Sequence, residues 1–198
     1  RLFYRIRIEG LENIPEDGGV LICPNHTTYV DAFIFGLSLK RHIRMVAWEL
    51  NFNNRWIGWF GRLADIIPIR PGSAASVRRS IREAQQALRD GDLVGLFPEG
   101  GLTRDGEIQP FQQGLVTIVR GTGAPVVPIY IGGLWGSVFS FERGRFFWKI
   151  PKRWPYPVSI RVGKPIYNPT DADEVRNAIL ALRDKDKLNH NDPQDQEN

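Results

Sequence analysis

Short runs of apolar, often β-branched residues alternate along the chain with segments in which apolar residues recur every three or four positions. The short runs predict strands, and the helical spacing predicts helices. The predicted strands cover residues 20–23, 43–47, 65–69, 93–97, 126–131 and 158–162. The predicted helices cover residues 32–39, 54–63, 73–90, 114–120 and 171–188.

Strands and helices that alternate at this spacing predict an α/β fold. We expect one layered domain over residues 1–188, with a largely parallel, mixed sheet flanked by helices. Pro68 interrupts the strand at 65–69, and because proline lacks an N–H we expect that strand at an edge or a bulge. Residues 189–198 are polar and predict a disordered tail or the start of a linker.

Composition narrows the function classes. The chain has 198 residues, 42% of them hydrophobic, which excludes a disordered protein. The only cysteine, Cys23, excludes a disulfide framework, and His26, His42 and His190 lack metal-ligand spacing, so no metal is expected. The net charge is only +4. The first residue is Arg1 and not Met, so we expect a part of a longer, multidomain chain.

The stretch between Arg120 and Glu142 carries no charge and is long enough to be considered as a membrane span. It contains several prolines and glycines, and its first part has the pattern of a turn followed by a strand. We therefore predict a buried strand and a loop there. No secretory signal begins the sequence.

The first chemical motif joins the first predicted strand to the first predicted helix, where Asp31 follows His26 by five residues. The two can meet only if His26 lies in the loop and Asp31 in the first helical turn. The carboxylate would then fix the imidazole tautomer and leave Nε2 as a base. Alternatively, Thr28 and Asp31 form a capping box in which Asp31 binds only backbone N–H groups.

Two further motifs follow predicted strands. Glu99, Gly100 and Arg104 belong to a glycine-rich turn that suits the close approach of an anionic group. Arg70 directly follows the proline-containing strand. Each has a plain alternative, a surface turn in the first case and a solvated charge in the second.

Together, these motifs resemble four sequence blocks of the PlsC-type glycerolipid acyltransferases, over residues 8–165. The blocks are His26-x4-Asp31, the Arg70 segment, Phe97-Pro98-Glu99-Gly100 and Val127-Pro128-Ile129. Residues 101–106 and 133–137 look most like the acyltransferase domains fused to acyl-carrier-protein synthetases. The resemblance implies a glycerol-3-phosphate acyltransferase-like fold.

The resemblance also implies a reaction. A fatty acyl group would move from an acyl-CoA or acyl-ACP thioester to the free hydroxyl of lysophosphatidylethanolamine or lysophosphatidate, with no other cofactor. His26 would be the general base, and Asp31 would orient it. Arg70, Glu99, Gly100 and Arg104 would form the acceptor-phosphate site, where we assign Glu99 to holding an arginine or a glycerol hydroxyl.

The chain departs from the family pattern in two blocks. Gly101 and Leu102 stand where the third block usually has Thr-Arg, so the arginine comes later, at Arg104. In the second block, Ile67 and Pro68 replace the usual aromatic-aliphatic pair. Both departures concern acceptor recognition, so the head group stays open.

Aromatic residues beside basic ones predict contact with a membrane surface. These aromatics are Trp56, Trp59, Phe60, Phe146 and Trp148. We expect a peripheral or anchored protein at the cytoplasmic face of the membrane. The alternatives are that these aromatics fill the core or that the basic segment binds an acidic acyl-carrier protein; at a net charge of +4 and without a motif, nucleic acid is not expected.

Two rival functions remain at this point. A catalytically silent lipid-binding regulatory domain would have the same fold, and a thioester hydrolase would use His26 to activate water. The pair of His26 and Asp31 disfavours the first, because binding alone does not need a base.

Overall fold

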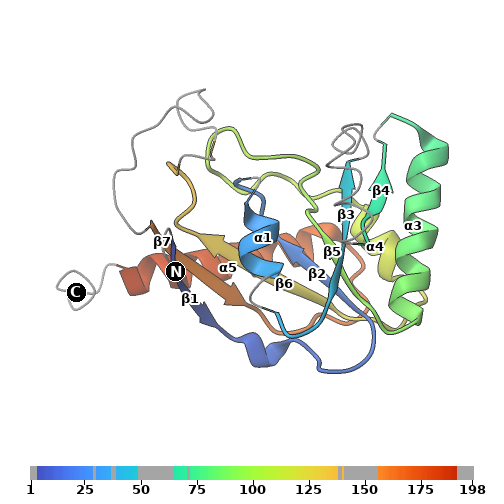
Figure 1. The fold of residues 1–198 in the computed structure, drawn as a ribbon, viewed down its shortest axis with the longest axis horizontal. Helices are drawn as coiled ribbons and strands as arrows, with labels where there is room; N and C mark the ends of the chain where they lie inside the picture. Colours follow the sequence, from blue (N-terminus) through green and yellow to red (C-terminus); the bar gives the residue numbers. More distant parts are fainter. Residues whose placement is uncertain are drawn as a thin grey trace.

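The computed structural model describes residues 4–28, 30–36, 39–48, 65–70, 72–137, 140 and 156–190. Within these residues, seven strands form one sheet in the order β1-β7-β6-β2-β5-β3-β4 (Figure 1). The strands are β1 (Tyr4–Glu9), β2 (Val20–Pro24), β3 (Ile43–Trp48), β4 (Ile67–Ile69), β5 (Leu93–Leu96), β6 (Val126–Gly132) and β7 (Tyr156–Val162). The helices are α1 (Asp31–Gly36), α3 (Ala74–Arg89), α4 (Gly114–Val119) and α5 (Ala172–His190), with a 3-10 turn, η1 (Leu11–Asn13).

The sheet is mixed and largely parallel, as the sequence predicted. From β6 to β4 every neighbouring pair is parallel, whereas β7 runs antiparallel to β6 and parallel to β1. The prediction for Pro68 is confirmed, because its strand β4 lies at an edge of the sheet, where a missing N–H costs least.

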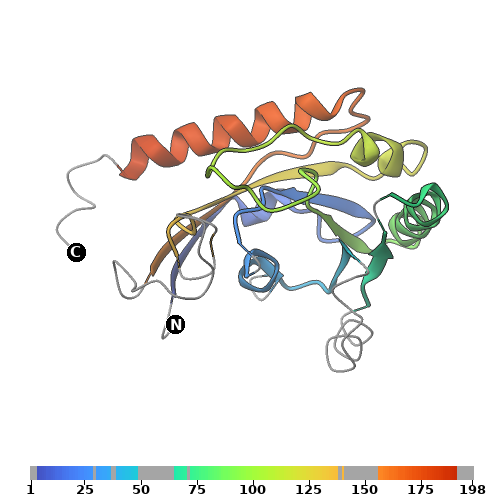
Figure 2. The same cartoon turned by 90° about the horizontal axis from the view of Figure 1, so that it is seen from above.

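Helices cover both faces of the sheet, so its central strand is apolar throughout. In β2, Leu21 and Cys23 pack into the cluster with α3, α4 and α5, while Val20 and Ile22 pack into the cluster with α1. Figure 2 shows α5 on one side of the sheet and α1 on the other. Burial on both faces explains the continuous hydrophobic run that identified β2 in the sequence.

The helix predictions hold where the structure describes them, with changes at the ends. The hydroxyl of Ser73 caps α3, and Gly91 follows the helix with φ +92°, a backbone conformation that favours glycine. The last helix, α5, continues to His190 and so includes two residues that we assigned to the tail. The helix predicted at 54–63 and the tail at 191–198 lie outside the described residues.

Candidate active site

The site is built where β2 and β5 end. These strands pair in parallel, with Val20 opposite Leu93, so their carboxyl ends lie side by side. The loop after β2 carries His26, and the loop after β5 carries Glu99. The Thr103 N–H donates to the His26 carbonyl oxygen at 3.0 Å and joins the two loops. Open α/β sheets bind their ligands at this end.

His26 and Asp31 are in direct contact. The Nδ1 atom of His26 lies 3.1 Å from Oδ2 of Asp31. His26 stands in the loop and Asp31 is the first residue of α1, which is the arrangement that their spacing requires. A carboxylate can only accept a hydrogen bond, so Nδ1 carries the proton and Nε2 has the free lone pair.

Asp31 is held in place by its own backbone surroundings. Its side chain is fully buried, and it accepts hydrogen bonds from the N–H groups of Thr27 at 2.6 Å and Thr28 at 2.8 Å. The hydroxyl of Thr28 donates to its second oxygen. These bonds stabilise a charge that burial alone would disfavour. Asp31 therefore does both things that the sequence allowed: it binds backbone N–H groups and it orients His26.

The imidazole of His26 also packs against an aromatic ring. The rings of His26 and Phe97 are stacked, with centroids 3.8 Å apart and planes at 15°. The His26 side chain is 15% exposed, so part of the ring stays accessible. Phe97 and Asp31 thus fix the plane and the rotation of the imidazole, while the side chain keeps some exposure to solvent.

Glu99 links the His26 loop to a more distant part of the β5 loop. One oxygen accepts the His26 N–H at 2.6 Å, and the other accepts the Gln109 N–H at 2.8 Å. We expected this carboxylate to hold an arginine or a glycerol hydroxyl. In the structure its oxygens instead receive two backbone N–H groups, which makes Glu99 a support of the loop that carries His26.

The environment of Glu99 shifts its ionisation. Burial raises the pKa of its carboxyl from an ordinary 4.5 to about 7, and the charge of Asp31 acts in the same direction. The N–H bonds from Gln109 and His26 and the charge of Arg176 act in the opposite direction but do not cancel the effect of burial.

This shift makes stability depend on pH. The folded state binds the Glu99 proton more tightly than the unfolded state does. Protonation of Glu99 therefore stabilises the folded state, fully below pH 4.5, and this contribution is lost as the pH rises through about 7. The loss is about 3 kcal/mol at 1.36 kcal/mol per pH unit. Glu99→Gln cannot titrate. We expect the difference in unfolding free energy between wild type and this variant to fall by that amount between pH 4.5 and 8, measured by urea denaturation. An unchanged difference would contradict the prediction.

Comparison with known proteins identifies the family. Residues 5–132 match the family model described as Acyltransferase, a span that includes the loops after both β2 and β5. The chain belongs to this acyltransferase family.

Two similar proteins are named 1-acyl-sn-glycerol-3-phosphate acyltransferases. The chain is 32% identical to a chloroplastic 1-acyl-sn-glycerol-3-phosphate acyltransferase of Brassica napus, over 89% of this chain and 50% of the relative. It is 32% identical to the 1-acyl-sn-glycerol-3-phosphate acyltransferase of Bacillus subtilis, over 71% of this chain and 69% of the relative. The chain thus spans only half the length of the Brassica protein.

A solved structure agrees with the fold. The crystal structure of the 1-acyl-sn-glycerophosphate acyltransferase PlsC from Thermotoga maritima matches with a TM-score of 0.68 and 26% identity. The match covers 95% of this chain and 73% of that one. The α/β architecture predicted from the sequence is therefore that of a PlsC acyltransferase.

The predicted acceptor residues are not all equally close to His26. Arg104 is exposed and directly follows Thr103, which is bonded to the His26 backbone. Gly100, at φ +74°, closes the turn after β5 with an N–H bond to the Phe97 carbonyl oxygen. Arg70 is exposed after β4, three strands from β2 or about 14 Å at about 4.8 Å per strand. The structure thus brings His26, Asp31, Glu99 and the Arg104 loop together and leaves Arg70 at the side.

The predicted membrane-contact residues Trp56, Trp59, Phe60, Phe146 and Trp148 lie outside the described residues. No helix within the described ranges combines the length and the apolar character needed to cross a bilayer. Among the same residues, no group of three or more His, Cys, Asp or Glu side chains could hold a metal ion.

One supporting residue was missed by the sequence analysis. Asn25 is buried beside His26, and its side-chain amide accepts the Ile131 N–H at 2.7 Å and donates to the Ile131 carbonyl oxygen at 3.1 Å. These two hydrogen bonds continue the contact between β2 and β6 beyond the end of β2, and they anchor the start of the His26 loop. The available signal was a polar amide directly after a wholly apolar strand.

Proposed function

We propose that this chain is a lysophospholipid O-acyltransferase that moves a fatty acyl group from a thioester to the free hydroxyl of a lysophospholipid. The observation that carries the proposal is the 3.1 Å contact between Nδ1 of His26 and the buried carboxylate of Asp31. It presents a positioned base in a loop at the ligand-binding end of the sheet.

The reaction follows from this pair. Nε2 of His26 takes the proton of the lipid hydroxyl as its oxygen attacks the thioester carbonyl. The new C–O bond forms, the C–S bond breaks, and His26 passes the proton to the leaving thiolate, which departs as a thiol. Asp31 stabilises the imidazolium that exists between these steps. Because the hydroxyl oxygen is itself the nucleophile, no covalent acyl-enzyme is needed, and Cys23 stays a buried core residue.

We assign the acceptor phosphate to the loop after β5. Arg104 supplies an exposed guanidinium in that loop, Gly100 lets the backbone approach the ligand, and Arg70 contributes from the side. The names of the relatives favour 1-acyl-sn-glycerol-3-phosphate, that is lysophosphatidate, as the acceptor. The likeness of residues 101–106 and 133–137 to synthetase-fused domains favours lysophosphatidylethanolamine and an acyl-ACP donor, in a larger multidomain chain.

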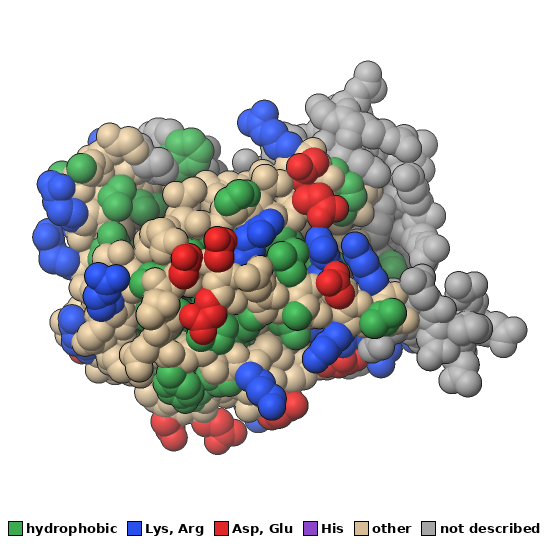
Figure 3. All heavy atoms as spheres, turned by 180° about the vertical axis from the view of Figure 1, so that it is seen from behind, with side chains coloured by type: hydrophobic (Ala, Val, Ile, Leu, Met, Phe, Trp, Pro, Cys, Tyr) green, Lys and Arg blue, Asp and Glu red, His purple; other side chains and the backbone are tan. Residues whose placement is uncertain are grey.

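We also propose a peripheral location at the cytoplasmic face of the membrane. Two large apolar side chains at the same end of the sheet as His26 support it: Phe33 of α1 is 54% exposed and Trp48 at the end of β3 is 48% exposed. The surface also has a basic face on α3 that suits an acidic acyl-carrier donor (Figure 3). Its exposed arginines are Arg78, Arg79, Arg82 and Arg89.

The test is a matrix of lysolipids against acyl donors. The purified chain is incubated with lysophosphatidate or lysophosphatidylethanolamine and with acyl-CoA or acyl-ACP, and the products are identified by mass. We expect a diacyl phospholipid that forms only when acceptor and donor are both present. Free fatty acid as the sole product would contradict the proposal and indicate a thioester hydrolase. Lipid binding without any product would replace it by a silent binding domain.

A further inference from the structure

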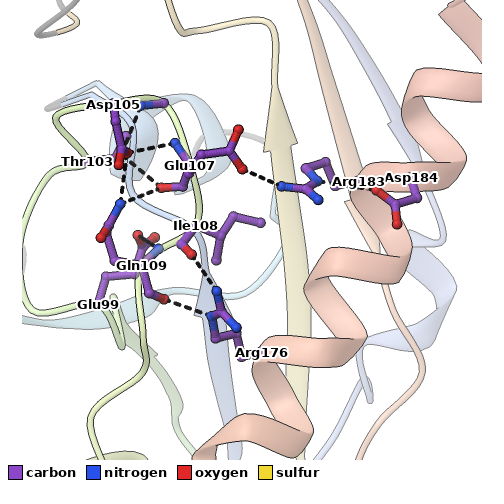
Figure 4. A network of polar contacts seen from close by, with 10 residues as sticks. Glu99, Thr103, Asp105, Glu107, Ile108, Gln109, Arg176, Arg183 and Asp184 are labelled. Atoms are coloured by element: carbon purple, nitrogen blue, oxygen red, sulfur yellow. Dashed lines mark hydrogen bonds and ion pairs between the residues drawn. The ribbon is translucent and has the colours of Figure 1, made fainter.

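Two arginines of helix α5 contact the loop that follows β5. Arg176 of α5 donates from Nε to the Gln109 carbonyl oxygen at 3.1 Å and from Nη2 to the Ile108 carbonyl oxygen at 3.0 Å. Figure 4 shows this guanidinium pointing from the helix to the two carbonyl groups. A planar guanidinium with donors on one edge fits two successive carbonyls better than a single ammonium does.

The peptide that Arg176 holds is the one that anchors Glu99. The N–H of Gln109 donates to Oε2 of Glu99 at 2.8 Å, and Oε1 of Glu99 accepts the His26 N–H at 2.6 Å. A continuous series of hydrogen bonds therefore runs from α5 through two loops to the backbone of His26. Ile108 is buried and Gln109 is half-buried, so little water is available to replace these bonds.

We propose that Arg176 is a positioning residue for His26, acting through the Ile108 and Gln109 carbonyl groups and the carboxylate of Glu99. The inference rests on the proposed function, in which His26 is the base. Without Arg176 the two carbonyls lose their donor, the Gln109 peptide is free to rotate, and Glu99 loses its second anchor. The His26 N–H then has a displaced acceptor, and the imidazole shifts relative to Asp31.

The positive charge of Arg176 also supports the hydrogen bonds that Glu99 accepts. It favours the ionised form of Glu99, the stronger acceptor for both N–H groups. Arg176 takes no direct part in two other contacts of His26, namely Nδ1 to Asp31 and the carbonyl oxygen to the Thr103 N–H. Loss of Arg176 is therefore expected to displace the His26 imidazole without abolishing its function as a base.

The same helix offers a matched control. Arg183 follows Arg176 by seven residues, two helical turns, and also contacts the loop after β5. Its partners are the exposed carboxylates of Glu107 at 2.8 Å and Asp184 at 3.3 Å (Figure 4). Exposed ion pairs contribute little, and neither carboxylate is bonded to Glu99 or His26 by any contact among the described residues. Arg183→Gln removes the same charge from the same helix without touching the series of bonds.

The kinetic test compares Arg176→Gln, Arg176→Lys and Arg183→Gln in the full chain. For Arg176→Gln we expect kcat to fall about tenfold with both KM values within about twofold, since remote misplacement of a base by ~1 Å can cost up to about 10²-fold in rate. Arg176→Lys can still bind one carbonyl and should recover most of the loss. Arg183→Gln should retain wild-type kcat. Equal kcat in Arg176→Gln and Arg183→Gln would overturn the proposal.

A spectroscopic test needs no substrate. In protein labelled with ¹⁵N-histidine, His26 is assigned by the signals that disappear in His26→Ala, and His42 serves as an internal reference. Wild type and Arg183→Gln should show the Nδ1–H tautomer of His26 alone, and Arg176→Gln should show a mixture. If Arg176→Gln does not fold, Arg176→Met, which also lacks the N–H donors, takes its place. An unchanged tautomer in the variant without these donors overturns the positioning role even if acyl transfer is found, and absence of transfer by wild type overturns only the proposed function.

Discussion

Replacing His26 by alanine should lower kcat for acyl transfer by about 10²–10⁴-fold, the range that a positioned general base contributes. Nε2 is the acceptor for the lipid hydroxyl proton, and His42 cannot replace it, because His42 lies exposed just before β3, at the opposite end of the parallel strands from the site. The two KM values should change little, since the base contributes mainly in the transition state. The measurement is a steady-state assay with labelled acyl donor and the lysolipid that the matrix identifies.

The fold should tolerate this change. The His26 contacts to Glu99 and Thr103 are made by its backbone, and Asp31 keeps its bonds to Thr27 and Thr28 when the imidazole is absent. Unfolding of the variant should therefore remain cooperative, with a melting temperature near that of wild type. His42→Ala removes an exposed histidine and controls for general effects. If His26→Ala retains transfer within a few fold of His42→Ala, the base assignment is wrong.

The part of the fold that the sequence predicted is the part with strong periodicity. The apolar run of β2 and the helical stripe of α3 each have a single interpretation, and both match the structure. Strand β1 was not predicted, although Ile6 and Ile8 alternate with Arg5 and Arg7. It is an edge strand with largely exposed side chains, so its hydrophobic signal is weak. The antiparallel direction of β7 depends on its pairing with β6, which local pattern does not encode.

The candidate site likewise has a part that the sequence predicted and a part that it did not. His26 and Asp31 are five residues apart, so local geometry was enough to predict that they could meet. The support from Glu99 and Arg176 was not predictable, because its partners are N–H and carbonyl groups that any residue type provides. Pro68 predicted an edge or a bulge for the strand before Arg70, but the strand order did not follow from the sequence, and only the structure shows that this edge lies three strands from β2.

The sharpest test of the His26–Asp31 pair is Asp31→Asn, because it removes the charge and preserves the shape. Among the described residues, Oδ2 of Asp31 accepts three N–H groups, from His26, Thr27 and Thr28, and Oδ1 accepts the Thr28 hydroxyl. An asparagine can place its carbonyl oxygen at Oδ2 and its amide nitrogen at Oδ1, where the Thr28 hydroxyl rotates to become the acceptor. All four contacts then remain.

The charge of Asp31 is nevertheless needed in the transition state. When His26 accepts the lipid proton, a neutral amide stabilises the imidazolium far less than a buried carboxylate does. We therefore expect kcat of Asp31→Asn to fall about 10²-fold or more, within the ~10²–10⁴-fold range of a positioned base. Asp31→Ala should lose stability as well, because the buried N–H groups of Thr27 and Thr28 lose their acceptor at about 1–3 kcal/mol each. Steady-state kinetics and urea unfolding of both variants would measure the two effects separately. A stable Asp31→Asn variant with wild-type kcat would show that Asp31 only caps its helix and has no part in the chemistry.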